Sequence, residues 1–159
     1  MRKPIVSVKR PSMIIVGISC RTSNDPKAAP VDIPKLWQRF YAEGIAGQIQ
    51  NKISEEVIAL YCDYEGDHTK PYTVVVGCPV SSVETKPEGM VVKIIPEASY
   101  IEYRAAGEHP KALMATWGKI WKTPLARTYT GDYEVYGQSF ARETDKEVQV
   151  YVAVGGPNA

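Results

Sequence analysis

Short segments in which apolar and polar residues alternate recur along most of the chain. This period of two is the pattern of β-strands that bury one face. Prolines 11 and 96 each separate a short segment from a longer one, so two pairs of strands with the same layout are expected. The predicted strands cover residues 5–8, 12–23, 56–64, 72–80, 89–96, 98–107, 132–139 and 148–154.

Two other segments carry apolar residues at helical spacing. The first helix is expected near Ile33–Glu43, with Asp32 as its N-cap and Pro34 in its first turn. The second is expected near Pro110–Trp121. The predicted inner face of the first helix comprises Ile33, Leu36, Trp37, Phe40 and Tyr41, and that of the second comprises Leu113, Thr116, Trp117, Ile120 and Trp121.

The order of these elements repeats. Each half of the chain reads strand, strand, helix, strand, strand, with an offset of about 85 residues. A strand–helix–hairpin unit cannot bury its helix alone, whereas two units can share a sheet. We therefore predict one α+β domain over residues 1–159, with halves at about 1–88 and 89–159. A single antiparallel sheet would carry two main helices on one face, with a pseudo-two-fold axis and a ligand groove where the halves meet.

Composition narrows the function classes. The formal net charge of the 159 residues is +1, and basic residues are scattered, so direct binding to nucleic acid is not indicated. No segment is long enough to span a membrane and the N-terminus does not resemble a signal peptide, so we expect a cytoplasmic protein. The three cysteines are far apart and fit free thiols. Ten tyrosines and three tryptophans against two phenylalanines favour a half-wet cleft, because Tyr and Trp combine an apolar body with a polar tip.

The segment TGDYEVYGQ places a carboxylate between two tyrosines on a predicted strand. Side chains alternate across a strand, so Glu134 and Tyr136 face one way while Tyr133 and Val135 face the other. Tyr61, on the corresponding strand of the first half, is expected roughly opposite Glu134. Two interpretations stay open at this point: Glu134 lies on a solvated face, or it lies in an aromatic pocket that binds a cationic aromatic ligand.

Other chemistry has little support in the sequence. The two histidines have no partner at metal-ligand spacing, and the alternating acids of DYEGD lack the glycine and the final glutamate of a calcium loop. No phosphate-binding glycine loop or nucleophile motif is present. We therefore expect no metal, no cofactor and no catalytic residue.

Several motifs in order resemble the gyrase-inhibitor-like effector-binding family, the drug-sensing domains of certain bacterial regulators and their free-standing relatives. They are YCDYEGDHTKPYTVVVGCPV, PEGMVVKIIPEASYIEYRAAGE, ATWGKIW and RTYTGDYEVYG, which together extend from about Ile14 to Val154. The resemblance implies a duplicated strand–helix–hairpin fold, in agreement with the repeat described above. It also implies that Glu134 points into a central pocket that accepts lipophilic cations.

The surrounding site residues are chosen from the predicted geometry. They are Tyr61, Tyr103, Tyr136, Trp37 and Trp121. The sequence departs from the resemblance at position 79, where Pro79 stands in place of a glutamate found in many relatives. We expect the site to lack a second acid for that reason, which disfavours hydrolysis.

The expected function is binding of a small organic cation by a sensor or sequestering protein that takes part in transcription regulation. The chain starts with a strand and has no room for a DNA-binding domain ahead of it, so we expect a module without its own DNA-binding domain, for which a regulator or a topoisomerase is a possible partner. Two alternatives stay open: a small-molecule hydrolase that uses Glu134 and a pocket tyrosine, and an interaction module that acts on a topoisomerase.

Overall fold

The computed structural model describes residues 7–67, 69–108, 111–137 and 147–155. Its strands are β1 (Ser7–Arg10), β2 (Met13–Thr22), β3 (Val57–Cys62), β4 (Tyr72–Val80), β5 (Val91–Ile95), β6 (Ala98–Ala106), β7 (Asp132–Tyr136) and β8 (Glu147–Val154). Its helices are α1 (Ala29–Ala42), α2 (Ile45–Gln48) and α3 (Lys111–Lys122). None of the helices in these residues is long and apolar enough to cross a membrane.

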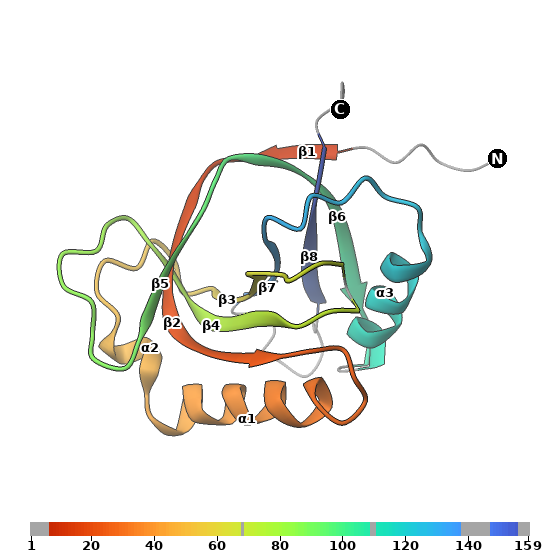
Figure 1. Ribbon diagram of the computed structural model, residues 1–159. Helices are drawn as coiled ribbons and strands as arrows, with labels where there is room; N and C mark the ends of the chain where they lie inside the picture. Colours follow the sequence, from red (N-terminus) through yellow and green to blue (C-terminus); the bar gives the residue numbers. More distant parts are fainter. Residues whose placement is uncertain (1–6, 68, 109–110, 138–146, 156–159) are drawn as a thin grey trace.

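All eight strands belong to one antiparallel sheet, in the order β1-β6-β8-β7-β3-β4-β2-β5. If each element of the first half is matched with its counterpart in the second, this order reads the same from both ends. The predicted pseudo-two-fold arrangement is confirmed, and its centre lies between β3 and β7. Figure 1 shows the sheet curling, with α1 and α3 outside it.

The strand pairings at the two ends of the sheet are formed by the same two stretches of chain. Ser7 pairs with Ile101 between β1 and β6, and Met13 pairs with Ile95 between β2 and β5. These pairs belong to one continuous register, so β1–β2 and β5–β6 are two bent strands that cross each other. The prolines at 11 and 96 mark the bends. The short strand of each half therefore pairs with the long strand of the other half.

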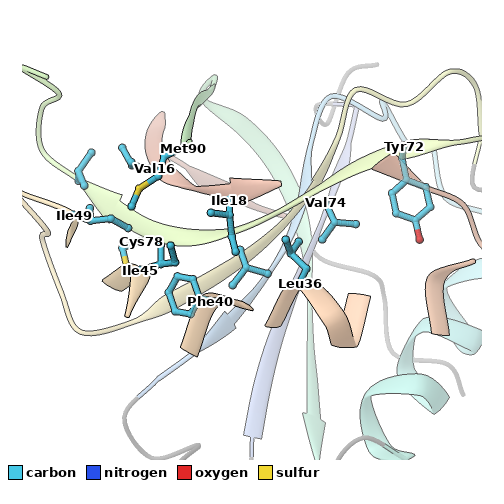
Figure 2. Close-up of a cluster of buried hydrophobic side chains, with 12 residues drawn as sticks. Val16, Ile18, Leu36, Phe40, Ile45, Ile49, Tyr72, Val74, Cys78 and Met90 are labelled. Atoms are coloured by element: carbon cyan, nitrogen blue, oxygen red, sulfur yellow. The ribbon is translucent and has the colours of Figure 1, made fainter. Parts of the chain in front are cut away.

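Both main helices cover the same face of the sheet, as predicted. Leu36 and Phe40 of α1 pack against β2 and β4, next to Ile18 and Val74 (Figure 2). Ile120 of α3 packs against the corresponding face of the second half. On every strand the residues in between point to the opposite, concave side.

The concave side is filled by a separate cluster with an aromatic centre. Tyr133 stacks on Tyr151 with ring centroids 5.0 Å apart, and both rings lie edge-on to Tyr100. The guanidinium of Arg10 lies over the Tyr151 ring at 4.5 Å, and its Nε donates to the Tyr133 hydroxyl at 3.0 Å. Tyr133 and Val135 thus face away from the helices, as the alternation predicts.

The first helix begins earlier than expected. Ala28 is its N-cap, and Asp32 lies within the first turn, where its carboxylate accepts a hydrogen bond from the Thr22 hydroxyl at 2.8 Å. Pro30 explains the difference, because a proline near the start of a helix lacks only an N–H that would have no partner there. Beyond the helix, Gly44 adopts a left-handed φ of 59° and leads into the short helix α2. In the second half Pro110 lies outside the described residues, and α3 extends to Lys122.

Candidate functional site

The candidate site lies at the pseudo-two-fold centre of the sheet, on the face covered by the helices. Glu134 is in the middle of β7, directly opposite Ala59 of β3. Its side chain is 1% exposed, so the solvated-face interpretation of this residue is excluded. Tyr61 is expected from the sequence roughly opposite Glu134; its backbone pairs instead with Asp132, two residues before Glu134 on the same face of the sheet.

Three side chains donate hydrogen bonds to the Glu134 carboxylate. The Tyr136 hydroxyl donates to Oε1 at 2.7 Å. The Tyr61 hydroxyl donates to Oε2 at 2.9 Å, and the indole Nε1–H of Trp117 donates to the same oxygen at 2.7 Å. The donors come from three elements, β3, β7 and α3, so both halves of the chain contribute to the site.

Burial and hydrogen bonding act in opposite directions on this carboxyl group. Burial raises the pKa of Glu134, because removal from water penalises the charged form, and the hydrogen bonds from Tyr136, Trp117 and Tyr61 oppose that rise. Burial, with the Glu134 charge beside them, also raises the pKa of Tyr61 and Tyr136 well above the usual value. Both phenols therefore remain protonated and able to donate.

Aromatic rings surround the carboxylate and its donors. Trp37 of α1 lies edge-on to Tyr136 with centroids 4.7 Å apart, and Trp117 lies edge-on to Tyr61 at 5.5 Å. Each tryptophan contacts a second aromatic ring one turn further along its helix. The ring centroids are 5.9 Å apart for Trp37 and Tyr41 and 6.4 Å apart for Trp117 and Trp121. The rings thus lead from solvent to the carboxylate along both helices.

The structure brings together most of the side chains selected from the sequence. Tyr61, Tyr136 and Trp37 lie around Glu134, and Tyr103 packs in the cluster beneath α3. Trp121 is further out and 41% exposed.

Trp117, for which the sequence predicts only a place on the inner face of its helix, is the tryptophan that contacts Glu134. Helical spacing places Trp117 and Trp121 on one face, and no sequence signal separates the one that reaches the sheet.

A second buried carboxylate, Asp132, lies two residues before Glu134 on the same face of β7. Its Oδ2 accepts hydrogen bonds from Arg127 Nη2 at 2.7 Å and the Tyr64 hydroxyl at 2.6 Å. Its Oδ1 accepts the backbone N–H of Ala153 at 2.7 Å. Arg127 and Asp132 form an ion pair with side chains only 6% and 0% exposed. No sequence motif indicates this pair, because its two partners are brought together only by the fold.

Position 79 lies on the opposite face of the sheet from Glu134. Pro79 pairs with Ile15, whose side chain belongs to the concave cluster, whereas its neighbour Cys78 faces the helices. An acid at position 79 would not face Glu134, so the departure noted there leaves this site unchanged. Among the described residues no group of three His, Cys, Asp or Glu side chains is arranged to hold a metal ion.

Comparisons with known proteins give the class to which this curled sheet with two helices over a buried carboxylate belongs, that of effector-binding domains. The model of the family described as "Integron-associated effector binding protein" matches residues 8–154. The chain belongs to this family, and the resemblance to gyrase-inhibitor-like effector-binding proteins is confirmed.

Three similar proteins illustrate the relationship. The "Putative transcriptional regulator protein YobU" of Bacillus subtilis is 31% identical over 144 residues, covering 87% of this chain and 89% of that protein. The integron cassette protein from the mobile metagenome of Vibrio cholerae has a TM-score of 0.73 and 25% identity, with 94% of each chain covered. The structure of SAV2435 bound to tetraphenylphosphonium has a TM-score of 0.76 and 18% identity, covering 97% of this chain and 95% of that one.

Proposed function

We propose that this protein binds a small, lipophilic, aromatic cation, with Glu134 as the counter-ion of its positive charge. The ligand would lie among the aromatic side chains between α1 and α3, with Trp37, Tyr61, Trp117 and Tyr136 nearest to it. The protein would act as a sensor or sequestering module in gene regulation.

One observation supports the proposal above the others: the two buried carboxylates on β7 are satisfied differently. Asp132 has an arginine in ion-pair contact. Glu134 has three neutral donors and, within the described residues, no cation in ion-pair contact. A buried carboxylate without a cation is costly, and a cationic ligand would supply what Arg127 supplies to Asp132.

The aromatic rings favour the same ligand class. The face of an aromatic ring attracts a cation by about 0.5–2 kcal/mol, more in a dry site. Flat or propeller-shaped aromatic ligands also gain from the apolar area that these rings offer. The bound tetraphenylphosphonium of SAV2435, a protein with this fold, is a ligand of this kind.

Binding requires a rearrangement. Glu134 is 1% exposed and its three donors enclose it, so a ligand reaches the carboxylate only when at least one donor side chain moves. The free energy of that movement lowers the apparent affinity, because only the open fraction of the protein is competent to bind.

A matched pair of ligands tests the proposal. Tetraphenylphosphonium carries a permanent charge, and triphenylphosphine oxide is a neutral aromatic phosphorus compound of similar type. We expect isothermal titration calorimetry to show that the phosphonium binds at least about tenfold more tightly, one charge-assisted contact in free energy. Equal affinities, or no binding of the phosphonium, would contradict the proposal.

A further inference from the structure

Three charged side chains lie together on the helix-covered face of the sheet. Asp132 and Glu134 are two residues apart on one strand, so their backbones are about 7 Å apart. Arg127 is the third charged side chain, and its Nη2 lies 2.7 Å from Oδ2 of Asp132. Two carboxylates and one guanidinium leave a single negative charge in this region.

All three charged side chains are buried. The side chains of Asp132 and Arg127 are 0% and 6% exposed, and Glu134 is 1% exposed. A chain of aromatic rings links the two carboxylates. Tyr61, which donates to Glu134, lies next to Tyr72 with ring centroids 5.8 Å apart, and Tyr72 lies 5.7 Å from Tyr64, which donates to Asp132. Charges at this separation in a poorly solvated region interact far more strongly than they would in water.

We propose that the Arg127–Asp132 pair sets the net charge of the binding site at −1, and thereby matches the site to ligands with one positive charge. The pair also has a structural role, because Arg127 and its neighbours pair with the end of β8. The electrostatic role is additional to it: the arginine cancels the charge of Asp132, so that a bound cation interacts with Glu134 alone. This inference rests on the proposed function.

The most informative variant is Asp132→Asn. It removes one carboxylate, while Arg127 stays protonated at any accessible pH. The uncancelled guanidinium would then remain in the same buried region as Glu134 and oppose a cationic ligand. We expect the affinity for tetraphenylphosphonium to fall by about tenfold or more, and that for triphenylphosphine oxide to change by less than about threefold.

The double variant Arg127→Met with Asp132→Asn is the matched control. It removes the pair but keeps the net charge of −1, so it should recover most of the phosphonium affinity lost in the single variant. A purely structural role of the pair predicts the opposite pattern: both ligands weaken together, and the double variant is at least as impaired as the single one. That pattern would overturn the inference, as would a single variant with unchanged preference between the two ligands.

Arg127→Met alone provides a second test that does not depend on how well the asparagine variant folds. The site would then hold two carboxylates and no guanidinium. We expect the preference for tetraphenylphosphonium over triphenylphosphine oxide to increase, and an unchanged or smaller preference would contradict the inference. If wild-type protein shows no such preference, the proposed function itself is wrong, which separates the two failures.

Discussion

At the scale of single residues, a buried carboxylate can be satisfied by hydrogen bonds, by a cation or by a proton. Glu134 already has the hydrogen bonds. Under the proposed function, a proton and a cationic ligand would therefore compete for the negative charge of Glu134. Because the pKa of Glu134 is raised in the empty protein by its burial, this competition extends to higher pH than for an ordinary glutamate. Cation affinity should fall as the pH drops through that pKa, and binding below it should release protons.

Removal of the Trp117 hydrogen bond should shift the pH range over which proton and cation compete for Glu134. Trp117→Phe keeps a ring but removes the N–H that stabilises the ionised carboxylate, so the pKa of Glu134 should rise further. We expect the decline of tetraphenylphosphonium affinity with falling pH to begin at a higher pH than in the wild type. Calorimetric titration over a pH series measures this shift.

Trp121→Phe is the control for that experiment. Trp121 lies one turn along the same helix, in contact with Trp117 and partly exposed. The same chemical change there should leave the pH dependence where it is in the wild type. A Trp117 variant with an unshifted pH profile would show that its hydrogen bond does not control the charge of Glu134.

Much of the site could be predicted from the sequence, because alternation along a strand is a strong constraint. It correctly placed Glu134 and Tyr136 on one face of β7. Helical spacing places Trp117 and Trp121 on the same face of their helix. It does not indicate which of the two reaches the sheet. It also could not reveal the Arg127–Asp132 pair, because a residue of a connecting segment becomes a partner only when that segment is placed in space.

At the scale of elements, β2 and β4 approach each other unusually closely at one point. Gly17 pairs with Gly77, and a Cβ at either position would collide with the backbone of the other strand. Backbone atoms in the middle of a sheet cannot move aside as a flexible side chain can. These two glycines therefore fix the spacing of the strands on which α1 rests.

Gly17→Ala should destabilise the protein by about 3 kcal/mol or more, because the added methyl group has no space. Gly118→Ala is the matched control: this glycine lies within α3, and a Cβ there would meet no atom within 4 Å. Alanine is a better helix former, so that variant should be more stable by up to about 1 kcal/mol. Urea denaturation of both variants measures the difference, and a Gly17 variant as stable as the wild type would contradict the packing described here.

The start of α1 shows how an element boundary is missed. A run of polar and proline residues before Asp32 favoured a loop, yet the helix begins at Ala29. Prolines near a helix start are compatible with the helix, so their presence does not locate the boundary. The carboxylate of Asp32 binds Thr22 of β2 and links the helix to the sheet instead of capping it.

At the scale of the whole molecule, the repeated order of elements was sufficient to predict the fold class. The crossing of the bent strands cannot be predicted in this way, because Pro11 and Pro96 indicate only a break between two strands. Pairing between segments about 90 residues apart leaves no local trace in a sequence. The result is that each half of the chain completes the sheet of the other, and the carboxylate of the second half is enclosed by side chains from both.

The ligand groove predicted where the two halves meet is instead a closed cluster of side chains around Glu134. Both helices direct a tryptophan toward the two-fold centre, where Trp37 packs on Tyr136 and Trp117 binds Glu134. Aromatic side chains fill the junction, and under the proposed function they would separate when a ligand of similar chemistry replaces their contacts. The central claim is that such a ligand is recognised by its positive charge.

The most direct test of this claim measures the binding of a charged and a neutral ligand to two proteins, one with and one without the charge of residue 134. Glu134→Gln keeps the size of the side chain and removes the charge. Titration of both proteins with tetraphenylphosphonium and triphenylphosphine oxide should show that the variant loses about 1.5–3 kcal/mol with the phosphonium and only a few tenths with the neutral compound. An equal loss for both ligands, or no loss with the phosphonium, would show that Glu134 does not recognise the charge.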